Sequence, residues 1–177
     1  SDLWFVQQEV AREQDARIKA NHLPVVADRS FVSGLAFGYA RQDIFGLGDA
    51  IYQHTVVRQA VDAGRLHTPW LAYLKIDINS SFERKRNDEE LRICEYGEEA
   101  VRNVRITEEE RKFFEKQIEF YERLFSRVPH LTLDALEVPN ALSGKVKQWS
   151  KGLPTQFISI NLDDLFVKPV RVEEWRP

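Results

Sequence analysis

Residues 70–77 read Trp-Leu-Ala-Tyr-Leu-Lys-Ile-Asp and predict a strand that the chain enters through Pro69. A shorter apolar run, Leu-Pro-Val-Val-Ala, occupies residues 23–27 and stops at Asp28. Because this run does not alternate between apolar and polar residues, it favours a strand that is covered on both faces, as in a parallel sheet. These two stretches decide the predicted fold class.

Helical patterns surround the two stretches. Helices are expected at 3–21, 31–40, 49–63, 79–86, 107–128 and 139–150, and further strands at 131–133 and 157–160. Ser30 is the expected N-cap of the second helix, and Thr107 with Glu110 forms a capping box. Helices and strands that alternate in this order predict an α/β fold, with a mostly parallel sheet and helices on both faces.

Composition limits the classes of function. The 177 residues carry 25 Lys and Arg against 28 Asp and Glu, a net charge of −3, which excludes a strongly basic nucleic-acid-binding surface. One cysteine, Cys94, rules out an internal disulfide and a cysteine-based zinc site, so an intracellular location is expected. No apolar run approaches the ~20 residues of a membrane helix, and the first residues do not resemble a signal peptide.

The stretch 87–106 is rich in charge and poor in large apolar side chains. Such a segment buries too little surface to offset the entropy of ordering it, so we expect a mobile charged flap there. The alternative is an ordinary exposed connection that never closes over anything.

Two pairs of charged residues stand out. Asp28 and Arg29 come at the carboxyl end of the expected first strand, where ligands bind in open α/β sheets, and Arg84 and Arg86 lie just before the flap. A guanidinium can bind an anion with two hydrogen bonds at once. The alternatives are a surface turn for Asp28 and Arg29, and a solvated helix end for Arg84 and Arg86.

Taken together, these motifs resemble the P-loop nucleoside and nucleotide kinases of the thymidylate kinase and deoxynucleoside kinase branch. The likeness runs over about residues 4–150 and is carried by short stretches in a fixed order: Val-Val-Ala-Asp-Arg-Ser at 25–30, the strand 73–77 with Arg84 at the first lid position, the helix around 109–121, and Leu-Thr-Leu-Asp-Ala at 131–135. The resemblance implies a three-layer α/β/α domain over 1–155 with a lid at 87–106. Residues 156–177 are expected to form a C-terminal strand and an extended tail.

The resemblance also implies roles for individual residues in a transfer of phosphate from ATP, with Mg²⁺. Arg29 would hold the acceptor, and Asp28 would orient its hydroxyl or a magnesium water. Arg84 and Arg86 would close on the transferred phosphoryl group. The acceptor would be bound by residues in and just after the second helix. For Phe37 and Tyr39 the alternative is core packing. The five predicted substrate-binding residues are Ser33, Phe37, Tyr39, Arg41 and Gln42. No resident metal site is expected.

One motif of that family is absent from the 177 residues: the phosphate loop G-x-x-x-x-G-K-[ST]. Three hypotheses therefore stay open. The protein is a nucleoside or nucleotide kinase whose phosphate loop lies upstream, an inactive kinase-like module for binding or assembly, or a kinase for another nucleoside-like molecule. The expected partner is a small nucleoside or nucleotide rather than a nucleic acid or a membrane, and a homodimer or larger assembly is left open.

Overall fold

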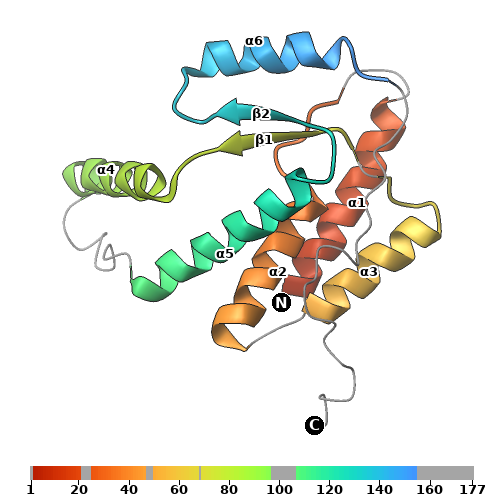
Figure 1. Cartoon of the computed structure of the whole chain (residues 1–177), viewed down its shortest axis with the longest axis horizontal. Coiled ribbons are helices and arrows are strands. Elements are labelled where there is room, and N and C mark those ends of the chain that lie inside the picture. The colour runs from red at the N-terminus through yellow and green to blue at the C-terminus, as the bar shows by residue number, and fades with distance from the viewer. Residues whose placement is uncertain (1, 21–24, 47–49, 68, 97–106, 155–177) are drawn as a thin grey trace. The chain divides into compact units, whose positions relative to one another are not determined.

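The computed structural model of the chain describes residues 2–20, 25–46, 50–67, 69–96 and 107–154 (Figure 1). Over these ranges the chain forms six helices and two strands. In chain order they are α1 (Asp2–Ala20), α2 (Phe31–Phe45), α3 (Ala50–Asp62), β1 (Leu71–Lys75), α4 (Ile78–Tyr96), α5 (Glu108–Phe125), β2 (His130–Asp134) and α6 (Pro139–Ser150). No helix in the described ranges is long and apolar enough to cross a bilayer.

The chain divides into two compact units, and the first comprises Ser1–Trp70, Lys116–Pro129 and Pro154–Pro177. Its helices α1, α2 and α3 lie side by side (Figure 1). Two glycines of α2 allow this close packing: a Cβ on Gly34 would lie 2.7 Å from a methyl carbon of Val6, and one on Gly38 would lie 1.9 Å from Gln53 Oε1. The core is apolar, and its best-buried large side chains include Phe31, Leu35, Val57, Phe120 and Leu124.

The second unit comprises Leu71–Glu115 and His130–Leu153 and contains the sheet. Strands β1 and β2 pair in parallel, with Leu71 opposite His130 and Lys75 opposite Asp134 (Figure 1). Helix α6 packs against β2. The carboxyl ends of two neighbouring parallel strands lie at the same edge of the sheet. Asp134 ends β2 and Asp77 follows β1, so both aspartates come at that edge.

The predicted three-layer α/β/α fold is wrong for the described chain, which is mostly helical and has one sheet of two strands. The strands predicted at 70–77 and 131–133 are confirmed as β1 and β2. Residues 25–27 form no strand, and Val26 is 80 % exposed, because no neighbouring strand pairs with them. The strand predicted at 157–160 lies outside the described residues.

The predicted end of the helix before the flap is also wrong. Helix α4 continues to Tyr96, although the sequence predicts its end near Arg86. Side chains such as Glu, Leu and Arg are good helix formers, so this charged stretch extends the helix without needing an apolar face. Residues 97–106 lie outside the part of the chain that the structure describes, and a closing motion of this region stays a prediction.

Both predicted helix caps are confirmed. The Ser30 hydroxyl accepts a hydrogen bond from the Val32 amide at 3.2 Å. At α5 the Glu110 amide donates to the Thr107 hydroxyl at 3.1 Å, and the Thr107 amide donates to a Glu110 carboxylate oxygen at 2.8 Å. These reciprocal bonds fix the first turn of α5, which borders the site described next.

Candidate functional site

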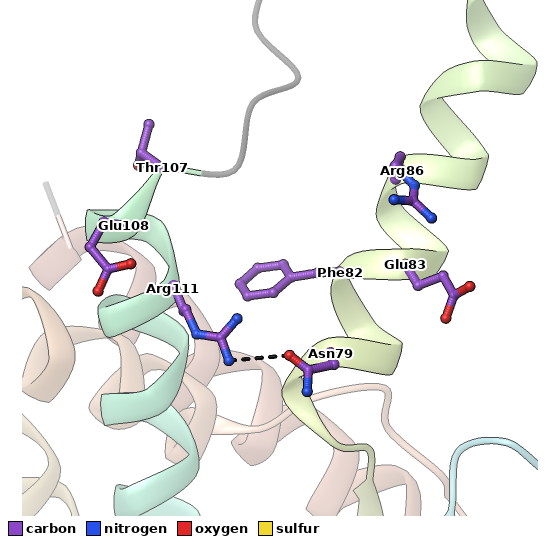
Figure 2. A pocket seen from close by; sticks show the side chains of 7 residues that line it. All are labelled: Asn79, Phe82, Glu83, Arg86, Thr107, Glu108 and Arg111. Atoms are coloured by element: carbon purple, nitrogen blue, oxygen red, sulfur yellow. Dashed lines mark hydrogen bonds between the residues drawn. The ribbon is translucent and has the colours of Figure 1, made fainter.

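A cavity of about 640 Å³ opens between the first half of α4 and the start of α5 (Figure 2). Every lining residue belongs to the second unit. The volume lies within the range of sites for small organic ligands. Seven residues line it: Asn79, Phe82, Glu83, Arg86, Thr107, Glu108 and Arg111.

The aromatic wall of the cavity is Phe82. Its side chain reaches from α4 towards α5 and is 9 % exposed (Figure 2). It packs edge to face on Phe114 of α5, with the ring centroids 5.5 Å apart. This contact joins the two helices on the apolar side of the cavity.

The polar wall is built around Arg111. Its Nη2 atom donates to Asn79 Oδ1 at 3.1 Å, and its Nε atom donates to Glu115 Oε1 at 3.3 Å (Figure 2). Both bonds hold the guanidinium in one orientation across the gap between α4 and α5. Because Asn79 uses its oxygen for Arg111, its amide nitrogen is left to donate to another group.

The start of α5 is held to α4 by a second polar contact. Lys85 Nζ lies 3.6 Å from Glu110 Oε1, while the other oxygen of Glu110 caps Thr107. The hydrogen bond from the Thr107 amide, helped by Lys85, holds the pKa of Glu110 below its usual value. Glu110 is therefore charged at neutral pH and is occupied by the helix cap and by Lys85.

The two predicted lid arginines have different surroundings. Arg86 lines the cavity, and its role in binding a ligand stays a prediction. Arg84 instead donates from Nη2 to the carbonyl oxygen of Ala135 at 2.7 Å, just after the end of β2. Arg84 thus joins α4 to the carboxyl end of the sheet.

Asp28 and Arg29 lie in the first unit, in the turn between α1 and α2 rather than at a strand end. Arg29 has a φ of 69°, the left-handed conformation that is unfavourable for a residue with a Cβ. Arg12 of α1 stabilises this turn, because its Nη2 donates to the carbonyl oxygens of both Asp28 (3.1 Å) and Arg29 (2.9 Å). Glu9 pairs with Arg12 and holds it in place.

Tyr121, a residue of α5, interacts with Arg29 of this turn. Burial raises the pKa of Tyr121, while a side-chain hydrogen bond with Ser33 and the charge of Arg29 act in the opposite direction. The structure therefore brings the predicted residues Arg29 and Ser33 together around one phenol.

The other predicted acceptor-binding residues lie along α2. Tyr39 donates to Glu119 Oε1 at 3.0 Å, and the Arg123 guanidinium lies 5.6 Å from its ring centroid, so packing and ion pairing already engage it. Phe37 is 42 % exposed. The backbone carbonyl of Gln42 accepts a hydrogen bond from the Gly46 amide at the end of the helix. Arg41 is half-buried.

Sequence reasoning missed three residues that shape these sites. Arg12 acts on a turn 16 positions away in sequence, and Asn79 and Arg111 meet across 32 positions. Each is an ordinary polar residue of an exposed helix face in the sequence, and no local pattern marks it. Among the described residues, no group of three His, Cys, Asp or Glu side chains is placed to hold a metal ion.

Comparisons with known proteins add no identification: no protein-family model, curated protein or solved structure matches the chain.

Proposed function

We propose that the protein transfers a phosphoryl group from Mg·ATP to a nucleoside or a nucleoside monophosphate, with a phosphate loop supplied by residues outside these 177. Magnesium enters with ATP as part of the donor substrate. The chain's own part is to position the acceptor and to neutralise charge on the phosphates, which is the main protein contribution in reactions of this type.

The observation that carries the proposal is the turn at Asp28 and Arg29. A left-handed arginine is unfavourable by an energy of order 1 kcal/mol or more, and such strain concentrates at functional sites. Two hydrogen bonds from Arg12 keep the turn in this conformation, and the Arg29 side chain is exposed. A pre-positioned, exposed guanidinium suits two-point binding of a phosphate or a 5′ oxygen.

A second observation supports the same chemistry. Arg86 lines a cavity whose size fits a nucleotide, next to an aromatic wall. Together with Arg29 it gives the chain two separate cationic positions, one in each unit.

The test is turnover by the full gene product. Mg·ATP is supplied with a panel of nucleosides and nucleoside monophosphates, and phosphorylated products are separated by chromatography. We expect one class of acceptor to be phosphorylated, and Arg29→Ala to lower kcat/KM at least ~10²-fold. Arg65→Ala is the matched control, because Arg65 is another exposed arginine of the first unit. Binding of an acceptor without any turnover would favour the alternative of a binding module and would refute the transferase.

The remaining expectations belong to the same proposal. The partner is a small phosphorylated molecule rather than a nucleic acid. We also propose an intracellular location, because Cys94 has no second cysteine with which to form a disulfide within the 177 residues.

A further inference from the structure

We propose that the protonation state of Glu13 controls how firmly Arg12 holds the turn at Asp28 and Arg29. Arg12 and Glu13 are neighbours on α1, and the turn leads into α2. The turn is then a pH-sensitive element of the first unit. This inference concerns the conformation of the turn, so it stands whether or not the protein transfers a phosphoryl group.

One nitrogen of Arg12 serves more acceptors than it can fully satisfy. Its Nη2 atom lies 3.1 Å from the Asp28 carbonyl oxygen and 2.9 Å from that of Arg29, and it also donates to Glu9 Oε2. An Nη atom has two N–H groups, so at least two of these three oxygens share one hydrogen. Because hydrogen bonds to a carboxylate are stronger than those to a carbonyl, the two bonds to the turn are the ones that weaken under competition.

The conformation of the turn depends on these two bonds. Arg29 has a φ of 69°, in the left-handed region that is unfavourable for a residue with a Cβ. Such a conformation persists only where the surrounding structure holds it. The bonds from Arg12 to the carbonyl oxygens of Asp28 and Arg29 supply that hold from α1. When they weaken, the turn is free to leave the left-handed conformation.

Glu13 is the carboxyl group that can compete for Arg12. Its Oε1 atom is buried and has no hydrogen-bond partner among the described residues. Burial raises the pKa of Glu13 to about 7, with Arg12 opposing the shift and Glu9 adding to it. Below this pH Glu13 is neutral, and Arg12 is left to Glu9 and to the turn. Above it, a second carboxylate attracts the guanidinium and weakens its bonds to the turn.

Other titratable groups lie on the elements that pack against α1, and the test has to separate them from Glu13. The charges that act on the Glu13 carboxyl belong to Arg12 and Glu9. Helices α2 and α3 both contact α1, and α3 carries a histidine, which also titrates near neutral pH. The titratable side chains of the turn and of these two helices are Asp28, Arg29, Tyr39, Arg41, Asp43, Tyr52, His54, Arg58 and Asp62.

The test is carbon-detected NMR of the isotopically labelled chain across the pH range around 7. It follows the Glu13 carboxyl carbon and the backbone carbonyl carbons of Asp28 and Arg29, which are the groups that accept from Arg12. We expect the two carbonyl resonances to shift with the same midpoint as the Glu13 carboxyl, near pH 7. Glu13→Gln should keep both at their low-pH positions at every pH.

Two further variants complete the test. Asp15→Asn is the matched control, because it removes an exposed acid of the same helix that pairs with Lys19, and it should titrate as the wild type does. Arg12→Ala should hold both carbonyl resonances near the high-pH positions of the wild type, without a transition. The dispersion of the same spectra shows whether each variant is folded.

Three results would overturn the inference. A transition of the two carbonyl resonances that persists in folded Glu13→Gln would assign it to another group, such as His54. Carbonyl resonances in Arg12→Ala that match the low-pH wild type would show that Arg12 does not hold the turn. Carbonyl resonances that stay fixed in the wild type while Glu13 titrates would contradict the coupling without the use of any variant.

Discussion

Arg29 combines a strained backbone with an exposed charge, so stability and function should respond to it in opposite directions. Arg29→Gly relieves the left-handed conformation and should raise the free energy of unfolding by up to about 1 kcal/mol. The same change removes the guanidinium and should lower kcat/KM at least ~10²-fold. Urea unfolding and steady-state kinetics measure the two effects. A variant that is stabilised and fully active would reduce Arg29 to a turn residue.

Gln53 is 1 % exposed, and neither of its amide atoms has a hydrogen-bond partner among the described residues. Its amide lies directly against Gly38. Gly38→Ala should therefore destabilise the protein by about 1–3 kcal/mol through overpacking. Gln53→Leu removes the unpaired polar group at similar volume and should be neutral or stabilising by about 1 kcal/mol. Thermal unfolding compares the two variants, and a Gly38→Ala protein as stable as wild type would disprove this close contact.

Glu13 is half-buried, and burial raises its pKa to about 7, although the charge of Arg12 partly opposes this shift. A carboxyl whose folded pKa is raised stabilises the fold most below its unfolded pKa of 4.5, and this contribution is lost as the pH rises to about 7. Glu13→Gln should therefore be more stable than wild type at pH 8, with a smaller difference at pH 5. Melting temperatures at the two pH values measure this, and an equal difference at both would contradict it.

At the scale of elements, α2 and the second half of α5 are joined by an ion network around Glu119. Lys116 donates to Glu119 Oε2 at 2.8 Å, and Arg123 and Tyr39 donate to Oε1 at 2.8 and 3.0 Å. Lys116 also lies 3.1 Å from Asp43 of α2. The network ties two helices of the first unit that are far apart in sequence.

Because of this network, we expect the contribution of Glu119 to stability to depend on pH in the opposite direction from that of Glu13. The hydrogen bond from Lys116, followed by that from Tyr39, holds the pKa of Glu119 below its usual value. Its contribution is present above the unfolded pKa and is lost as the pH falls through the folded pKa. Glu119→Gln should cost roughly 1 kcal/mol or less at pH 7, because the group is partly exposed, and the loss should shrink towards pH 4. A loss that is constant with pH would show that charge plays no part.

The elements that the sequence predicted well are those with local causes. Ser30 and the pair Thr107 and Glu110 carry their caps within three residues, so the helix starts could be predicted. The end of α4 could not, because a charged helix former and a charged loop have similar compositions. Residues 25–27 have the apolar character of a strand, but a strand also needs a partner, and composition does not supply one.

At the scale of the whole molecule, the fold class failed for a related reason. The long connection between β1 and β2 allows them to pair in parallel, whereas the number of strands in a sheet depends on contacts between distant residues. The residues of the candidate site likewise fall into those marked by a local motif and those placed by contacts between distant residues. Arg29 and Arg86 stand in local motifs and could be named, while the positions of Asn79 and Arg111 around Phe82 follow only from the packing of α4 on α5.

Chemical labelling of arginines in the full gene product tests the central claim most directly. Phenylglyoxal modifies accessible guanidinium groups, and peptide mass spectrometry gives the rate at each arginine with and without saturating Mg·ATP and acceptor. If phosphates bind where we propose, Arg29 and Arg86 are modified more slowly in the presence of substrates, while Arg65 is unaffected. Unchanged rates at both arginines under saturating substrates would contradict phosphate binding by these residues.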